Sequence, residues 1–421
     1  MKYPIKVLQK NNQLKAFPRN TKEVSIIMKY CNEKKINVIP LGGETNRVGG
    51  TKGELDNYNM FIDFKEMNKI EEIDVENMII TTQAGTKLKK IQDISSKKGL
   101  IFPVNIAPND KCTIGGNIST NVGGLQTLKY GNIEDHINGL EVVLSDGTII
   151  DFQSKLKKDN FGPKLWKMFC GSEGIFGTIT KANLKLLPKK KFKITYLLEI
   201  ASLSKANKLL KSTRNAYYDD LISFEIIFPI PSYFLFNKKT YHLIIEFNSN
   251  RKIDFINDIK KKNIFKDFKV ARLEKNIPDS WIWSKREELV HNQNKHNFIH
   301  KFDISLPLNK WGYFVREVNK FIFKNKIYTP YFFGHLGDGN LHCNFKIEPN
   351  IKKNLNLLSK FIYKLAIKCD GSIAAEHGLG LLKNNLLIKY KSKNYYEFLV
   401  KFKKHLDPNL ILGKNKLFKA Q

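Results

Sequence analysis

The sequence predicts an α+β protein with two domains, and three observations carry this prediction. Up to about Pro188, short β-branched runs alternate with helical patterns and glycine-rich turns. A lysine cluster, Lys189 to Lys193, marks the predicted boundary. From Ile194 to about Pro349, strand and helix patterns alternate in a way typical of an antiparallel sheet with helices on one face, and the remaining residues favour helices around one glycine-rich segment.

The elements of the first region follow from the spacing of its apolar residues. Val24 to Tyr30 has apolar side chains at helical spacing, and residues 36–40, INVIP, form a short apolar strand that ends in a glycine-rich turn. Three further stretches carry β-branched runs closed by Asn, Asp or Gly, as strands do. They are residues 60–64, 70–85 and 137–152.

The second region carries strands predicted at residues 194–200, 224–230 and 241–247, where apolar and β-branched residues dominate. A helix is predicted between the first two strands, at residues 204–212. The chain has 421 residues, of which 42% are hydrophobic, and this supplies enough apolar material for two or three cores of ordinary size.

The formal net charge is +31, which raises nucleic acid and an anionic membrane surface as candidate partners. Seven of the 71 basic residues are Arg, however, and the bidentate guanidinium is the usual group that grips bases and phosphates. Lysine is spread along the whole chain, which indicates a solvated lysine coat. We therefore expect no nucleic-acid partner and at most peripheral contact with a membrane.

The cysteines and the apolar runs bear on the compartment. Five cysteines lie far apart without a Cys-x-x-Cys pair, which predicts reduced packing residues. No apolar run approaches the roughly 20 residues that cross a bilayer, and the first residues, MKYPIKVLQKNNQLKAF, lack the apolar stretch of a secretory signal. These observations lead us to expect a soluble, cytoplasmic protein.

Three glycine-rich segments lie in the first region, at residues 38–50, 113–124 and 171–180. Glycines let backbone N–H groups converge on an anion and tolerate positive φ. The first segment has neither the phosphate-loop nor the dinucleotide-binding spacing, and alone it is either a tight turn or a ligand cradle. Three such loops in one domain are costly in chain entropy. They therefore favour a bound, flat and polar ligand over three unrelated turns.

Five segments resemble, in order and spacing, the FAD-binding domain of the vanillyl-alcohol oxidase type: residues 40–50, 114–124, 130–131, 139–147 and 171–174. Residues Lys157 to Asn160 are most similar to the D-2-hydroxyglutarate dehydrogenase branch, with D-lactate and glycolate dehydrogenases as related branches. The resemblance covers nearly the whole chain. It implies FAD, with the first loop near the pyrophosphate and the other two lining the rest of the cofactor.

The same resemblance implies a set of cofactor-binding positions in the three loops and the strands beside them. They are Pro40, Gly42, Gly43, Glu44, Thr45, Asn46, Gly49, Gly50, Pro103, Thr113, Gly116, Asn117, Thr120, Asn121, Gly123, Gly124, Gly174 and Ile179.

A histidine cluster is predicted in the second region. In the run YFFGHLGDGNLHCNF, a Gly-Asp-Gly turn separates His335 from His342, and Asn344 shares a strand face with His342. Two imidazoles near one turn are either half of a divalent-metal site or a hydrogen-bonded pair. The segment AAEHGLG offers Glu376 as an oxygen ligand and His377 as a base.

The resemblance assigns roles to these residues. His335, His342 and Glu376 would bind a divalent metal, expected to be zinc, and His377 would remove the hydroxyl proton of the substrate. Asn344 would orient the substrate.

The resemblance also implies cationic anchors for a substrate carboxylate. They are Arg286 and Lys301, and Arg is the natural bidentate clamp for such a group. The alternative for Arg286 is a surface pair with Glu287 or Glu288, and for Lys301 it is one more solvated lysine.

The first loop departs from the family pattern. Glu44, Asn46 and Arg47 stand where the family usually has Asn, Gly and an apolar residue. Glu44 would bring an anion near a pyrophosphate, for which Arg47 would compensate. Asn tolerates left-handed φ better than other non-glycine residues, so the turn is expected to survive.

Two departures lie outside the first loop. Val290 stands where the hydroxyglutarate branch has a hydroxyl residue, which bears on the identity of the substrate. Near the end, Gly413 and Lys414 replace an Asn-Pro pair, whereas Lys416 keeps the final lysine of the pattern.

The resulting hypothesis is a two-domain flavoenzyme. Residues 1–188 would bind FAD in two subdomains, and residues 189–421 would form an antiparallel-sheet substrate domain whose C-terminal helices return toward the flavin domain. It would oxidise a D-2-hydroxy acid, foremost D-2-hydroxyglutarate, by hydride transfer to FAD. Electrons would pass to a separate acceptor, such as an electron-transfer flavoprotein or a quinone, and a homodimer is compatible with the sequence.

Three alternatives remain open at this point. The first is a D-lactate or glycolate dehydrogenase of the same family. The second is a basic protein that binds nucleic acid or an anionic surface, which would leave the three loops unexplained. The third is a flavin-binding protein with impaired turnover, suggested by Glu44, Val290 and Gly413.

Overall fold

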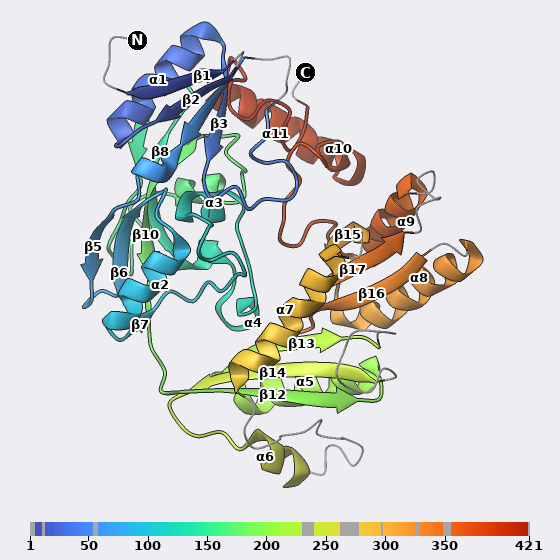
Figure 1. Ribbon diagram of the computed structural model, residues 1–421. Helices are drawn as coiled ribbons and strands as arrows, with labels where there is room; N and C mark the ends of the chain where they lie inside the picture. The colour runs from blue at the N-terminus through green and yellow to red at the C-terminus, as the bar shows by residue number, and fades with distance from the viewer. Residues whose placement is uncertain are drawn as a thin grey trace. The chain divides into compact units, whose positions relative to one another are not determined.

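The computed structural model describes residues 5–10, 13–53, 58–229, 240–261, 278–295, 298–325, 328–347 and 355–419. The chain forms two compact units (Figure 1). The first unit comprises residues 1–124, 131–189 and 376–421, and the second comprises residues 125–130 and 190–375. The chain thus enters the second unit beside the predicted lysine boundary, but its last segment, placed by the sequence in the second domain, clusters with the first unit.

The first unit begins with a small mixed sheet of strand order β1-β2-β4-β3. The strand β1 pairs antiparallel with β2, whereas β4 runs parallel to both β2 and β3. The strands are β1 (Lys6–Lys10), β2 (Gln13–Phe17), β3 (Asn37–Leu41) and β4 (Asn59–Asp63).

The helix α1 (Thr21–Lys34) connects β2 to β3. Asn20 caps its first turn by accepting a hydrogen bond from the backbone N–H of Glu23. Val24, Ile27, Met28 and Cys31 are spaced by three or four residues and are buried, as the helical pattern predicts. The helix ends at Lys35, which has a left-handed φ of 54°.

A second sheet of the first unit is entirely antiparallel and has the strand order β5-β6-β10-β8-β9. These strands are β5 (Ile70–Asp74), β6 (Ile79–Gln83), β8 (Ile137–Val143), β9 (Ile149–Asp151) and β10 (Thr178–Lys185). The helices and strands beside them are α2 (Leu88–Lys97), β7 (Leu100–Ile101), α3 (Ile114–Ser119) and β11 (Leu187–Pro188). The two sheets agree with the predicted two-subdomain flavin-binding fold.

The C-terminal segment completes the first unit with α10 (Leu386–Tyr390) and α11 (Lys393–Leu406). The ammonium of Lys403 is buried and donates to the carbonyls of Ile175 and Leu412, at 2.7 and 2.8 Å, and to the carboxylate of Asp407. Beyond α11, the backbone N–H of Val38 in β3 donates to Ile411 at 2.6 Å. The chain end is therefore built into the first unit.

The second unit is organised around a six-stranded antiparallel sheet of order β12-β14-β13-β16-β17-β15. Its strands are β12 (Phe192–Ile200), β13 (Leu221–Ile227), β14 (Tyr241–Ser249), β15 (Phe298–Ser305), β16 (Tyr328–His335) and β17 (Asn340–Ile347). Its helices are α4 (Thr127–Tyr130), α5 (Leu203–Tyr217), α6 (Phe255–Lys261), α7 (Asp279–Lys295), α8 (Trp311–Asn325) and α9 (Leu355–Lys368).

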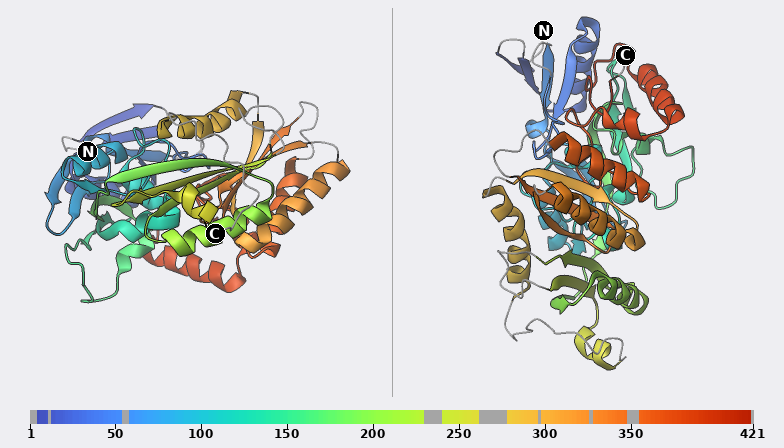
Figure 2. Two further views of the ribbon diagram at one scale, coloured as in Figure 1. Left: turned by 90° about the horizontal axis from the view of Figure 1, so that it is seen from below. Right: turned by 90° about the vertical axis from the view of Figure 1, so that its right-hand side faces the viewer.

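Helices cover both faces of this sheet, so the expectation of helices on one face is wrong (Figure 2). The helices α5, α8 and α9 pack on the apolar face. There Phe302 of β15 contacts Phe345 of β17 and also Tyr363 of α9. The opposite face is covered by α7, and its mixed lining includes Glu225 and Glu246. The sequence of α7 lacks a clear apolar stripe because the face that it covers is partly polar.

Among the described helices, none combines the length and the apolar content that crossing a bilayer requires.

Replacing Lys403 by Ala should destabilise the first unit strongly, because it leaves the carboxylate of Asp407 buried without its cationic partner. We expect the free energy of unfolding to fall by about 3–5 kcal/mol, measured by urea unfolding. The exposed neighbour Lys404 provides the matched control, since Lys404→Ala should change stability by no more than about 0.5 kcal/mol. Equal effects of the two variants would contradict a structural role for the buried ion pair.

Candidate active site

The three glycine-rich segments meet in the first unit. The first segment follows β3, and a Cβ on Gly43 would collide with the backbone of Lys111, directly before the second segment. The third segment lies on α3 of the second, because Gly171 and Glu173 donate backbone hydrogen bonds to Ile118 and Ser119 at 3.0 and 2.7 Å. Three loops far apart in the sequence therefore form one surface.

The polar atoms of this surface fit a bound cofactor. The hydroxyl groups of Thr113 and Thr178 are buried and have no hydrogen-bond partner in the described part of the chain. A buried hydroxyl without a partner is unfavourable unless another group completes it. Gly42 and Gly43 have no side chain, so the first loop can lie close to the second. This close approach and the two hydroxyl groups suit a ligand with polar edges, as the resemblance to FAD-binding domains implies.

The turn of the first loop differs from the expectation. The left-handed residue is Glu44, with φ of 54°, and Asn46 has no positive φ. The Asn46 side chain instead closes the turn by accepting hydrogen bonds from the backbone N–H groups of Val48 and Gly50, at 2.8 and 3.1 Å. Glu44 and Arg47 are exposed, and among the described ion pairs none joins them.

The remaining predicted cofactor residues are not all available to a ligand. Pro103, Asn117 and Ile179 are buried. Thr120 donates its hydroxyl to Gly116 at 3.0 Å, and the Asn121 side chain accepts from the backbone of Glu134 at 3.3 Å. These groups shape the second loop by hydrogen bonding within the protein.

Two charged residues that the sequence did not single out as a pair lie together in the first unit. Burial raises the pKa of Glu173, although the backbone N–H groups of Leu379 and Gly380 and the nearby Lys416 oppose this. Burial also lowers the pKa of the Lys416 ammonium to about 8, although Glu173 counteracts the effect. The two side chains therefore stabilise each other's charged forms.

In the second unit, the hairpin of β16 and β17 brings the predicted metal ligands together. His335 pairs in register with Asn340, and Phe333 pairs with His342. The two imidazole rings lie 5.5 Å apart, centroid to centroid, in an edge-to-face arrangement. On the neighbouring strand β15, Lys301 is opposite Asn344, so these predicted substrate residues are cross-strand neighbours on the histidine face.

Glu225 is a central residue of this face that sequence reasoning missed. It lies on β13 opposite His335 and accepts a hydrogen bond from the Nδ1 atom of that imidazole. The guanidinium of Arg286, on α7, donates to the same carboxylate through Nε and Nη2 at 3.3 and 3.2 Å. Burial disfavours the charged carboxylate, but His335, Arg286 and His342 outweigh this and hold the pKa of Glu225 at about 2.

Arg286 thus belongs to neither of the predicted surface pairs. Its side chain is buried, lies over the ring of Phe333 at 4.8 Å and pairs with Glu225. The signal for Glu225 was available in the sequence as one acid inside the strand LISFEII, of which every residue is buried. A lone acid in an apolar strand needs a partner.

A second carboxylate, Asp303, supports His342. It is buried on β15 opposite His342, and one of its oxygens lies 3.9 Å from the Nδ1 atom of that imidazole. The same oxygen accepts a hydrogen bond from the side chain of Asn340 at 2.8 Å. Each histidine therefore has a carboxylate on its Nδ1 side, which is hydrogen-bonded to His335 and 3.9 Å from His342. This is the arrangement of metal-binding histidines.

The third predicted ligand, Glu376, directly follows Ala375, whose backbone N–H donates to Asp303 at 3.3 Å. The candidate ligand atoms of His335, His342 and Glu376 all lie within 4.8 Å of one another. Two nitrogen donors and one carboxylate oxygen are a ligand set that suits zinc with an open position. Val290 cannot be compared with its expected role, because its side chain lies outside the described residues.

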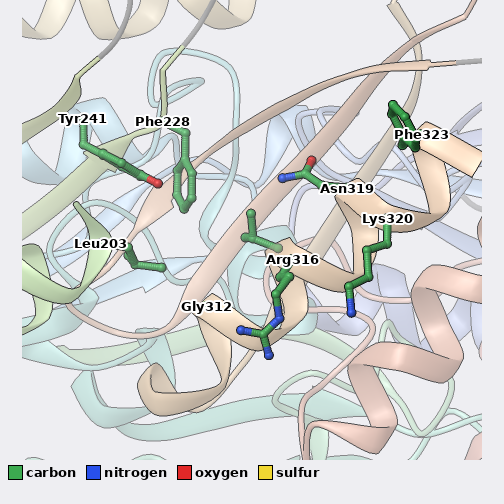
Figure 3. A pocket seen from close by; sticks show the side chains of 9 residues that line it. Leu203, Phe228, Tyr241, Gly312, Arg316, Asn319, Lys320 and Phe323 are labelled. Atoms are coloured by element: carbon green, nitrogen blue, oxygen red, sulfur yellow. The ribbon is translucent and has the colours of Figure 1, made fainter. Parts of the chain in front are cut away.

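A hollow of about 500 Å³ in the second unit is separate from this cluster (Figure 3). It is lined by Phe228, Tyr241 and residues of α8. Phe228 stacks on Trp311 and follows Ile227 at the end of β13, so it lies on the sheet face opposite Glu225 and Ile227. The hollow therefore belongs to the face that carries α8.

Comparison with known proteins defines the class. Residues 13–153 match the FAD binding domain family, and residues 232–417 match the C-terminal domain of FAD linked oxidases. The D-2-hydroxyglutarate dehydrogenase of Arabidopsis thaliana is 30% identical over 97% of this chain and 75% of its own length. A Schizosaccharomyces pombe protein named as a D-lactate dehydrogenase is 32% identical over 95% of this chain and 80% of its own.

A solved structure supports the same fold. An alkyldihydroxyacetonephosphate synthase superposes with a TM-score of 0.71 at 18% identity, over 95% of this chain and 75% of that one. The class is therefore that of FAD-dependent oxidoreductases with the fold expected from the sequence. The chain belongs to the FAD-linked oxidase family.

The expected cytoplasmic localisation is wrong. The relatives from Arabidopsis thaliana and Schizosaccharomyces pombe are both named mitochondrial, which points to that compartment. The expectation rested on the lack of an apolar span and of a secretory stretch. Neither feature distinguishes between soluble compartments.

Replacing Gly43 by Ala should weaken FAD binding, because the new Cβ would collide with the backbone of Lys111 and separate the first two loops. Overpacking of this kind costs about 1–3 kcal/mol, which corresponds to about 5- to 150-fold in affinity. The measurement is titration of the FAD-free protein with FAD, followed by flavin fluorescence. Gly312→Ala is the control, since a Cβ at Gly312 meets open space. Unchanged affinity in Gly43→Ala would contradict the close approach of the loops.

Lys416 should make stability depend on pH. In the folded protein the Lys416 ammonium loses its proton near pH 8, whereas in the unfolded chain it keeps that proton up to about pH 10.5. The unfolded state therefore binds more protons within this window, and the stability contributed by the site rises with pH. Below pH 8 the ammonium is charged in both states, and its burial then lowers the free energy of unfolding by the full desolvation penalty.

The measurement is urea unfolding of the wild type and of Lys416→Met at several pH values. The difference in unfolding free energy, wild type minus variant, should increase between pH 8 and 10.5. A difference that stays flat or falls with pH would contradict a buried cationic Lys416.

Proposed function

We propose that this protein oxidises a D-2-hydroxy acid to the corresponding 2-oxo acid, with FAD as the hydride acceptor. The observation that carries the proposal is the cluster of His335, His342 and Glu376, whose histidines are supported by two buried carboxylates. The relatives named as D-2-hydroxyglutarate and D-lactate dehydrogenases support the same substrate class. Within this class we assign D-2-hydroxyglutarate as the first candidate.

We assign FAD to the three glycine-rich loops and a divalent metal to His335, His342 and Glu376. When bound, FAD would accept the hydride, and a divalent metal, with zinc the best match to two imidazoles and a carboxylate, would favour the ionised substrate hydroxyl. The hydrogen bond from Nδ1 to Glu225 would keep His335 in one tautomer and one orientation, and the Asp303 carboxylate lies 3.9 Å from the same atom of His342. We assign FAD to residues 1–188 and substrate contacts to residues 189–421.

The remaining residues act on the substrate directly. His377 would remove the hydroxyl proton as the general base. Lys301 and Asn344, which are cross-strand neighbours, would bind and orient the carboxylate. Reoxidation would use a separate acceptor, for which an electron-transfer flavoprotein and a quinone are the candidates.

A second candidate substrate is a monocarboxylate such as D-lactate or glycolate. Arg286, the expected clamp for a second carboxylate, already donates through Nε and Nη2 to Glu225. Its charge is therefore balanced within the protein. This pairing is the observation that favours a substrate with one carboxylate as the second candidate.

The proposal is tested by a screen of D-2-hydroxy acids with a dye as electron acceptor, before and after metal removal by a chelator. We expect turnover that chelation abolishes and zinc restores. His342→Ala should lower kcat/KM by at least about 100-fold, because the metal contributes several kcal/mol to transition-state stabilisation. His405→Ala, which changes an exposed histidine, is the control. Turnover that is unaffected by complete metal removal would exclude the metal role.

The choice between dicarboxylate and monocarboxylate is tested with Arg286→Lys, which keeps a cation beside Glu225 but loses the planar fork. If Arg286 clamps a second carboxylate, kcat/KM should fall by about tenfold or more for D-2-hydroxyglutarate and much less for D-lactate, since a charged hydrogen bond contributes about 1.5–3 kcal/mol. Metal content is measured in parallel. Equal losses for both substrates would contradict the dicarboxylate assignment.

A further inference from the structure

The segment His377–Gly380, which carries the proposed base, lies directly on two of the glycine-rich loops. The carboxylate of Glu173, in the third loop, accepts hydrogen bonds from the backbone N–H groups of Leu379 and Gly380, at 2.8 and 2.9 Å. One carboxylate oxygen faces each N–H group. A charged acceptor makes such hydrogen bonds stronger than neutral ones.

The first loop holds the other side of the same segment. The Nδ2 atom of Asn46 donates to the carbonyl of His377 at 3.3 Å, while the Oδ1 atom closes the loop on Val48 and Gly50. The carbonyl of Val48 also accepts from the backbone of Leu382 at 3.1 Å. One amide side chain thus serves both the turn and the segment.

The backbone of the segment leaves little room for another arrangement. Gly378 and Gly380 have φ of 72° and 52°. A Cβ on Gly378 would collide with the Glu173 carboxylate, and one on Gly380 would collide with the carbonyl of Val48. Glycine at both positions therefore permits the close approach of the segment to the two loops.

We propose that Glu173 and Asn46 are positioning residues, which hold His377–Gly380 on the cofactor loops so that FAD binding and orientation of the base are coupled. A ligand that orders the loops then also orders the segment, and loss of the ligand loosens both. This inference rests on the proposed function for the role of His377. The coupling itself can be measured without any substrate.

The experiment compares amide hydrogen exchange of peptides that cover residues 377–382 in the FAD-loaded and the FAD-free protein. We expect FAD to slow exchange there in the wild type. Glu173→Gln leaves a single acceptor oxygen for two N–H groups, so exchange in the loaded variant should be about tenfold faster or more. Glu141→Gln is the matched control, because Glu141 is a mostly buried acid of the same unit that bonds Thr21 and Thr180 instead.

Asn46→Asp separates the two tasks of the amide. An Asp carboxylate can still accept from Val48 and Gly50 but cannot donate to the carbonyl of His377. Faster exchange at 377–382 with FAD still bound, as judged by the flavin absorption, is the expected result. This variant also keeps the inference testable if Glu173→Gln does not fold.

Kinetics distinguish positioning from simple destabilisation. In both variants kcat should fall by about tenfold while KM changes by less than about twofold, because substrate binding is left intact and proton removal is impaired. Exchange that is insensitive to FAD in the wild type, or identical in the variants and the wild type, would overturn the inference even if the enzyme oxidises a hydroxy acid. Altered exchange in a protein that oxidises no hydroxy acid would instead refute the proposed function and leave the coupling intact.

Discussion

A buried carboxylate, Glu225, is the constraint on which the second unit depends. A charge inside a sheet is tolerated only with compensation, and here it comes from one imidazole on a neighbouring strand and one guanidinium on α7. The helix α7 is therefore fixed on the polar face, and His335 is fixed in the tautomer that carries its proton on Nδ1. The Glu225 carboxylate thus holds both the helix α7 and the candidate metal ligand His335 in place.

The first unit uses the opposite strategy, which is close approach of backbone without side chains. Gly42 and Gly43 let the first loop lie against the second, and the third loop hydrogen-bonds to α3. The buried hydroxyl of Thr113 then remains for a ligand. A surface of this kind is incomplete without its cofactor, so folding and cofactor binding of this unit are linked.

The sequence predicted what local pattern and motif order can encode. It identified α1, the strand before the first loop and the antiparallel sheet of the second unit, and it predicted that the three glycine-rich segments share one ligand. It did not identify Glu225, whose partner His335 is 110 positions away, or Glu173, whose partner Leu379 is 206 away. Contacts of single residues over such separations leave no periodic pattern. The turn conformation was also mistaken, because Asn46 acts through its side chain and Glu44 takes the left-handed position.

The pairing of Val38 with the segment after α11 has a consequence for biosynthesis. A parallel bridge joins Val38 to Leu412, which lies 374 positions later in the sequence. During translation, this partner of β3 is made only after the intervening unit, almost wholly residues 190–375, has been synthesised. Nascent β3 would meanwhile expose an unpaired edge, the kind of surface that chaperones shield.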